Sequence, residues 1–256
     1  MRVETIGTCT LYCGNCLEVM PTLCSQSINC VLADLPYGTT YASWDSVIPL
    51  DKLWEQYKRL IIGSGALVFT SNQPFTTALI QSNIEWFKYE WVWDKKNASN
   101  FANAKKQPLK QHENVVVFSG GCPPYYPIKM KGKPNHKQGR STVNVSETRL
   151  ISGRSVDDLS GMKFPKSILR FPKHSSQCGL HPTQKPTELM AYLVQTYTVP
   201  GELVLDNAMG SGSTGVSAVQ TGRKFIGIEK EPKYFEVACQ RLSDELKKEQ
   251  VEKQAL

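Results

Sequence analysis

The chain has 256 residues, of which 40% are hydrophobic, and its formal net charge is +7. This size and apolar content suit one large domain, or one domain with a sizeable insertion. The longest apolar runs, 60–62 and 115–118, are far shorter than the ~20 residues that a membrane span requires. Because no signal peptide is visible either, we expect a cytoplasmic protein without a membrane segment.

Eight cysteines are scattered irregularly along the chain. In a long sequence without a leader, such placement is typical of reduced thiols rather than of a disulfide framework. Cys13 and Cys16 have the spacing of half a zinc site or of a redox motif. No second close pair and no histidine pair follows them, so we interpret them as core or loop cysteines and expect no metal.

The first chemical landmark follows a buried type of strand. A strand over 8–12 and a short helix precede an apolar strand over 28–33, which ends in Asp34-Leu35-Pro36-Tyr37-Gly38. A carboxylate, a proline with a fixed backbone and an exposed aromatic ring at the carboxyl end of a strand would form a rigid clamp for a flat, polar ring. The alternative is a Pro-Gly turn with an unrelated acid before it.

Helices and strands alternate in the next part of the chain. The apolar pattern predicts helices over 53–61 and 72–82, and strands over 66–70, 88–93 and 115–118. Tyr89, Trp91 and Trp93 share one face of their strand, which indicates core packing rather than a platform for stacking bases. Strands joined by crossover helices imply an α/β fold with a doubly wound, mostly parallel sheet.

Residues 120–180 differ in character from the rest of the chain. Prolines and glycines are frequent, helical periodicity disappears, and eleven Lys or Arg face three Asp or Glu, a net charge of +8. This excess favours contact with a polyanion, with a solvated basic loop as the alternative. We therefore divide the chain into a catalytic domain, residues 1–119 and 181–256, and a basic insertion, residues 120–180.

The last part of the chain contains a glycine-rich loop between a strand and a helix. The pattern predicts helices over 187–197, 213–220 and 234–249, and strands over 203–205 and 224–228. The first of these strands ends in Asp206 and the second in Glu229.

Two cofactors fit this strand-loop-helix-strand unit. The glycines between Gly210 and Gly215 match the dinucleotide pattern G-x-G-x-x-G, with Glu229 available for a ribose diol, which would suit NAD. Asp206 and Asp34, however, end strands that we expect at one sheet edge, where carboxylates would repel a pyrophosphate and attract a sulfonium cation. This favours S-adenosylmethionine, and a simple turn would need fewer glycines.

Together the landmarks resemble the amino-methylating DNA methyltransferases, adenine N6-specific and with the permuted beta-group motif order. Their catalytic signature Asp/Asn/Ser-Pro-Pro-Tyr appears as Asp34-Leu35-Pro36-Tyr37, and their cofactor signature is similar to Asp206-Asn-Ala-Met-Gly-Ser-Gly-Ser-Thr214. His181-Pro-Thr-Gln-Lys-Pro186 is similar to the segment that precedes the cofactor loop in this group. The resemblance implies a seven-stranded methyltransferase sheet with 120–180 as an inserted target recognition segment. The residues that depart from the family pattern are Leu35, Asn207, Ala208 and Ser213.

The resemblance implies a role for each landmark. Asp34 and the Pro36 carbonyl would accept the hydrogens of an adenine amino group, and Tyr37 would stack on the flipped base. Glu229 would hold the ribose diol, and Asn15 would meet the adenine edge of the cofactor, because its Gly-Asn turn resembles a Gly-Asp position in the family. The other expected cofactor contacts are Asp206, Met209, Gly210, Ser211, Gly212 and Lys185.

The expected partner is double-stranded DNA, methylated at adenine N6. The acid at position 34 is typical of adenine enzymes but not exclusive to them, so N4-cytosine methylation stays an alternative. Two other interpretations have less support from the sequence. An NAD-dependent oxidoreductase is supported only by the glycine pattern, and a non-catalytic nucleic-acid binder only by the basic insertion. The resemblance also leaves room for a homodimer and for a cognate restriction endonuclease. The residues expected to contact DNA are Lys131, Lys133, Arg140, Arg149, Arg154 and Arg170.

Overall fold

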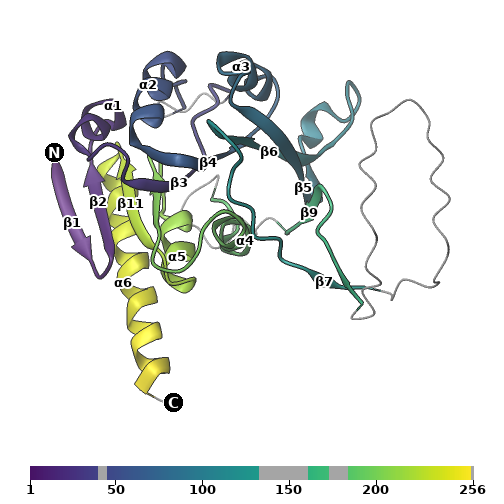
Figure 1. Cartoon of the computed structure of the whole chain (residues 1–256). Coiled ribbons are helices and arrows are strands. Elements are labelled where there is room, and N and C mark those ends of the chain that lie inside the picture. The colour runs from purple at the N-terminus through teal and green to yellow at the C-terminus, as the bar shows by residue number, and fades with distance from the viewer. Residues whose placement is uncertain (40–44, 133–160, 173–183, 255–256) are drawn as a thin grey trace. The chain divides into compact units, whose positions relative to one another are not determined.

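The computed structural model describes residues 1–39, 45–132, 161–172 and 184–254 (Figure 1). The chain divides into two compact units, Met1–Tyr126 with Ser167–Leu256, and Pro127–Lys166. None of the helices that the structure describes has the length and apolar character of a transmembrane span.

The first unit is built on one sheet, whose strand order in the described chain is β1-β2-β11-β10-β3-β4-β6-β5-β9. From β2 to β4 all neighbours pair in parallel, whereas β1 is antiparallel to β2, and β6 is antiparallel to both β4 and β5. The short β9 lies parallel to β5. The strands are β1 (Arg2–Ile6), β2 (Cys9–Cys13), β3 (Ile28–Ala33), β4 (Ile61–Ser71), β5 (Phe87–Ser99), β6 (Lys110–Phe118), β9 (Ile168–Arg170), β10 (Leu203–Asp206) and β11 (Lys224–Glu229).

Helices cover both faces of this sheet. Figure 1 shows α1, α2 and α3 on one face and α4, α5 and α6 on the other. The helices are α1 (Cys16–Val19), η1 (Met20–Thr22), α2 (Leu50–Leu60), α3 (Phe75–Ser82), η2 (Phe101–Asn103), α4 (Thr187–Tyr197), α5 (Ser213–Gln220) and α6 (Pro232–Gln254).

The central strands bury both of their faces. Successive side chains of a strand point to opposite faces, so Cys30 and Leu32 of β3 pack in the core with α4, α5 and α6, whereas Val31 and Ala33 pack in the core with α2 and α3. This double burial explains why 28–33 is a continuous apolar run rather than an alternating one.

The predicted fold class is confirmed. The seven strands from β2 to β5 in the sheet order form the expected doubly wound arrangement, and β1 and β9 extend it by one edge strand each. The prediction for the aromatic stripe is also confirmed, because Trp91 and Trp93 are buried in the core and Tyr89 packs against it.

The second unit contains a two-stranded antiparallel ladder in its described part. β7 (Met130–Lys131) pairs with β8 (Met162–Lys163), and the Gly132 N–H donates to the Gly161 carbonyl at 2.8 Å. This unit lies within the predicted insertion of 120–180 but is shorter, and Arg170 falls in the first unit, on β9. Four of the residues expected to contact DNA lie outside the described residues: Lys133, Arg140, Arg149 and Arg154.

Candidate functional site

The site lies where the winding of the sheet reverses. β3 is flanked by β4 on one side and by β10 on the other, so the carboxyl ends of two strands that are distant in sequence lie side by side. Asp34 directly follows β3 and Asp206 ends β10. Open α/β sheets bind ligands at such a switch point, and a cavity of about 280 Å³ is present here.

Residues from several segments line this cavity. They come from the turn after β2, the segments after β3 and before α2, the segment that leads into α4, the loop after β10 and the end of β11. Tyr37, Gly210 and Gly212 lie outside its lining. The predicted site residues within the lining are Asn15, Asp34, Pro36, Lys185, Asp206, Met209, Ser211 and Glu229.

Asp206 organises the loop that follows it. Its Oδ1 accepts the Ala208 N–H at 3.0 Å and its Oδ2 accepts the Thr214 hydroxyl at 2.6 Å. The residue is only 2% exposed, and this burial raises the pKa of its carboxyl to about 7, although both hydrogen bonds act in the opposite direction.

Glu229 is anchored by the backbone on both of its carboxylate oxygens. Oε2 accepts the Gly210 N–H and Oε1 accepts the Glu231 N–H, each at 2.8 Å. Gly210 has a φ of +52°, in the left-handed region that favours glycine, and this conformation lets its N–H meet the carboxylate. Burial raises the pKa of Glu229 above its ordinary value. The carboxylate therefore lies at the cavity wall in a fixed orientation.

Two asparagines of the cavity wall differ in how their polar atoms are used. Asn15 accepts the Leu17 N–H on its Oδ1 at 3.1 Å and so caps α1. Asn207 accepts the Tyr57 hydroxyl on its Oδ1 at 2.7 Å, but among the described residues its Nδ2 has no hydrogen-bond partner. Asn207 is 3% exposed, so the sequence departure at this position places an unpaired amide donor at the wall of the cavity.

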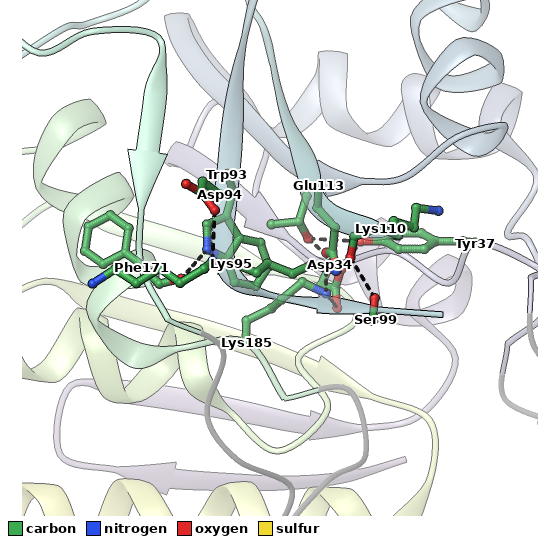
Figure 2. Close-up of polar contacts among 12 residues, drawn as sticks. Asp34, Tyr37, Trp93, Asp94, Lys95, Ser99, Lys110, Glu113, Phe171 and Lys185 are labelled. Atoms are coloured by element: carbon green, nitrogen blue, oxygen red, sulfur yellow. Dashed lines mark hydrogen bonds and ion pairs between the residues drawn. The ribbon is translucent and has the colours of Figure 1, made fainter. Parts of the chain in front are cut away.

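Asp34 is held by three side-chain donors, two of which, Tyr37 and Lys185, are labelled in Figure 2. Lys185 Nζ donates to Oδ2 at 2.6 Å, whereas the hydroxyls of Tyr37 and Thr70 both donate to Oδ1. Lys185 also lies 3.6 Å from Glu113 Oε2. Donors from three different parts of the fold thus meet at one carboxylate.

The Tyr37 ring is already packed in this structure. It stacks on Phe75 with ring centroids 5.3 Å apart and an interplanar angle of 25°, and the Lys185 ammonium lies 5.6 Å from its centroid. Burial raises the pKa of the Tyr37 hydroxyl well above its ordinary value, so this group remains a donor to Asp34 at neutral pH. The stacking of Tyr37 on a target base stays a prediction.

Sequence reasoning missed two members of this cluster, Thr70 and Glu113. Thr70 lies near the end of β4, the strand beside β3, so its position at a carboxyl strand end was a signal that could have revealed it. Glu113 lies on β6 before the apolar run that predicted that strand, and no local pattern marks it. Arg170, expected to contact DNA, forms an ion pair with Asp94 at 3.7 Å and is largely exposed.

Comparisons with known proteins agree with this geometry. A family model described as DNA methylase matches residues 28–240. The type II methyltransferase M.HinfI of Haemophilus influenzae is 27% identical over 271 aligned positions, which cover 92% of this chain and 68% of the relative. The DNA adenine methyltransferase YhdJ of Escherichia coli (strain K12) is 26% identical over 262 aligned positions, which cover 91% of this chain and 82% of the relative. The crystal structure of an M1.HpyAVI–SAM complex matches with a TM-score of 0.62 at 21% identity, covering 91% of this chain and 99% of that one.

Proposed function

The chain belongs to the DNA methylase family, and on this premise we propose that it transfers a methyl group from S-adenosylmethionine to the N6 amino group of adenine in double-stranded DNA. The observation that carries the proposal is that Asp34 and the Asp206 loop line one cavity at the switch point of the sheet. The name of the relative YhdJ, a DNA adenine methyltransferase, supports adenine as the target base.

The charge of the cavity fits the cofactor. Four carboxylates line it, and they attract the sulfonium and ammonium groups of S-adenosylmethionine but would repel the pyrophosphate of NAD. They belong to Asp34, Asp206, Glu229 and Glu231. In this proposal Glu229 binds the ribose diol, and the cofactor also meets Asn15, Asp206, Met209, Gly210, Ser211 and Gly212.

The catalytic residues act on the target amino group. When bound, S-adenosylmethionine supplies an electrophilic methyl group on a sulfonium sulfur. Asp34 and the Pro36 carbonyl accept the hydrogens of the adenine amino group, so that the nitrogen lone pair faces the methyl carbon. The lone pair forms the N–C bond while the electrons of the C–S bond return to sulfur. The surplus proton on nitrogen then leaves through Asp34, whose side chain is 24% exposed, to solvent.

A base within a duplex cannot reach this cavity while it is stacked, so it must be flipped out, at a cost of a few kcal/mol. We assign the compensating phosphate contacts to the basic residues of 120–180, including Lys131 and Arg170, with this segment as the recognition element. The cytoplasmic location, the homodimer and the cognate restriction endonuclease expected from the sequence stay predictions.

Sequencing of DNA from a methylation-free host that expresses the protein tests the proposal. We expect N6-methyladenine at one recurrent sequence. Asp34→Ala should slow methyl transfer by at least about 100-fold, the size of effect seen when a positioned polar group is removed, while calorimetry shows an affinity for S-adenosylmethionine that is largely retained. The matched control is Asp51→Asn, an exposed acid in the first turn of α2. N4-methylcytosine in the same reads would refute adenine as the target, and unmethylated DNA would refute the activity.

A further inference from the structure

A row of alternating charges leads from the interior of the sheet to Asp34. Lys95 on β5 contacts Glu113 Oε1 on β6 at 3.2 Å, and Glu113 Oε2 lies 3.6 Å from Lys185, which binds Asp34 at 2.6 Å (Figure 2). The side chains of Lys95, Lys185 and Glu113 are 4%, 9% and 13% exposed. Water therefore screens these charges poorly, and each one depends on its neighbours.

The two oxygens of Asp34 are occupied unequally. A carboxylate oxygen has two lone-pair positions. Among the described residues, Oδ1 accepts the hydroxyls of Tyr37 and Thr70, whereas Oδ2 accepts Lys185 alone. The acceptor position that remains for an incoming amino group is therefore on Oδ2, directly beside the Lys185 ammonium.

This neighbour is unfavourable during the reaction. As the adenine amino nitrogen forms its bond to the methyl carbon, it gains positive charge, and a second cation on the same carboxylate oxygen opposes that gain. The lysine has another place to bind, because Glu113 Oε2 is buried and accepts no hydrogen bond from any described residue. Lys95 holds the other oxygen of the same carboxylate and so keeps Oε2 turned toward Lys185.

We propose that Lys185 is a positioning residue shared between two carboxylates rather than a cofactor ligand. It holds Asp34 until the target base arrives and then moves to Glu113 Oε2, which leaves Asp34 Oδ2 to the amino group. A movement of about 1 Å converts the 3.6 Å separation into a hydrogen bond. This inference rests on the proposed function. Burial alone would lower the pKa of Lys185, but the charges of Asp34 and Glu113 outweigh it and raise that pKa, so the shared group remains a cation.

Calorimetry on Lys185→Met separates the two roles of this lysine. A positioning role predicts that S-adenosylmethionine binds as tightly as in the wild type or more tightly, because a cation has been removed from a cavity that takes a cationic ligand. A cofactor-binding role predicts the opposite sign, and affinity reduced tenfold or more would overturn the proposal. The control is Lys247→Met, an exposed lysine on α6.

Single-turnover methylation of plasmid DNA from a methylation-free host tests the second anchor. We expect Glu113→Gln to slow transfer at least tenfold, which corresponds to about 1.4 kcal/mol in the barrier, with little change in cofactor affinity. The double variant Glu113→Gln with Lys185→Met should be no slower than Lys185→Met alone, because Glu113 then has no cation to receive. The control is Glu90→Gln, an exposed acid on β5 that accepts the Asn114 amide.

Some results would overturn the proposed role of Lys185, and another would refute only the proposed function. Two results would contradict the sharing of Lys185 between Asp34 and Glu113. One is a wild-type rate of methyl transfer in Glu113→Gln, and the other is a double variant in which the two substitutions slow transfer additively. If Lys185→Met does not fold, as the loss of one buried partner could cause, Lys185→Arg takes its place. Its rigid fork should keep cofactor affinity and still slow transfer, because it cannot be passed between carboxylates as an ammonium can. A wild-type protein that binds the cofactor but methylates no DNA refutes the proposed function, while calorimetry still decides the role of Lys185.

Discussion

Three carboxylates at the switch point have different roles because their oxygens have different partners. Asp206 uses one oxygen on the loop that follows it and the other on the first turn of α5, and Glu229 uses both on backbone N–H groups. Asp34 instead receives three side-chain donors, of which Thr70 and Lys185 come from distant segments. The first two are fixed parts of the cavity wall, whereas the third has partners that can rearrange.

We expect Glu229→Ala to weaken S-adenosylmethionine binding by roughly 10- to 150-fold. The reason is the loss of charge-assisted hydrogen bonds to the ribose diol, worth about 1.5–3 kcal/mol. The control is Glu231→Ala, which removes another carboxylate from the wall of the same cavity. Calorimetry on both variants distinguishes a specific contact of Glu229 with the ribose from a general attraction by negative charge. An equal loss of S-adenosylmethionine affinity in the two variants would indicate the general attraction.

The pKa of Asp206 predicts a pH dependence of stability. Its folded value of about 7 lies above the ordinary value of 3.8, so the native state retains a proton that the unfolded chain has released. Unfolding free energy should therefore fall as the pH rises from about 4 to about 7, and the contribution is lost above that range. In Asp206→Asn this dependence is absent, so the difference in melting temperature, wild type minus variant, should shrink between pH 5 and pH 8. A constant difference would contradict the assignment.

The sequence could predict the polar residues at strand ends as site residues, but it could not predict which side chains these residues bind. Asp34, Asp206 and Glu229 follow apolar runs, and parallel strands bring such ends to one edge. Lys185, however, is 151 residues from Asp34, and the ion pair depends on how α4 docks beside β3. The sequence therefore predicted which residues gather at the site but not which of them bind one another.

At the scale of elements, the cofactor loop depends on close packing of α5 against β11. A Cβ added to Gly215 of α5 would lie 2.7 Å from Phe225 Cε1 and 3.1 Å from Leu242 Cδ1. Both neighbours are fully buried, so neither can move aside. The third glycine of the loop motif thus serves helix packing rather than ligand contact.

We expect Gly215→Ala to lower the melting temperature. Alanine improves helix propensity by up to about 1 kcal/mol, but overpacking a buried ring costs about 1–3 kcal/mol, so the packing penalty should prevail. Gln220→Ala, an exposed position on the same helix, should stay within about 0.5 kcal/mol of the wild type. Thermal unfolding measures both, and a raised melting temperature for Gly215→Ala would show that the ring yields.

Prediction of the elements succeeded where the apolar residues of a segment pack in the core. The predicted bounds of β3, α4 and α5 agree with the structure, because their apolar patterns reflect tertiary packing directly. β1 was missed because, at the edge of the sheet, it is mostly exposed and its sequence RVETI has no apolar run. β5 extends to Ser99, beyond the predicted 93, since its polar end is held by backbone pairing with β6.

At the scale of the whole molecule, positive charge is concentrated away from the catalytic residues in sequence. Residues 120–180 carry +8 of a chain whose total is +7, so the remainder is close to neutral. The described parts of Pro127–Lys166 contain four lysines and no acid. Composition could predict this segment as a polyanion contact, but not its limits, because a unit boundary is set by contacts between distant residues.

DNA affinity should fall with salt in proportion to the phosphates contacted, by about 0.9 in the logarithmic slope for each. We expect Lys131→Ala and Lys166→Ala each to flatten the slope by about that amount and to weaken cognate and scrambled duplexes alike. Both lysines are exposed. Lys247→Ala on α6 is the control and should leave the slope unchanged. Binding measured across a salt series gives these slopes. Unchanged slopes for Lys131→Ala and Lys166→Ala would show that these lysines do not contact phosphates.

Base preference should depend on the middle of the same unit. Gly132 and Gly161 are hydrogen-bonded across the β7–β8 ladder, so an Asn-Gly turn can replace residues 133–160 without displacing the two strands. That segment contains Arg140, Arg149 and Arg154, side chains able to read base edges at about 1–3 kcal/mol each. The shortened protein should bind cognate and scrambled duplexes equally and still bind S-adenosylmethionine. If it keeps its preference, the base-reading residues belong instead to another part of the protein, such as the connection between β5 and β6, which carries Lys105 and Lys106.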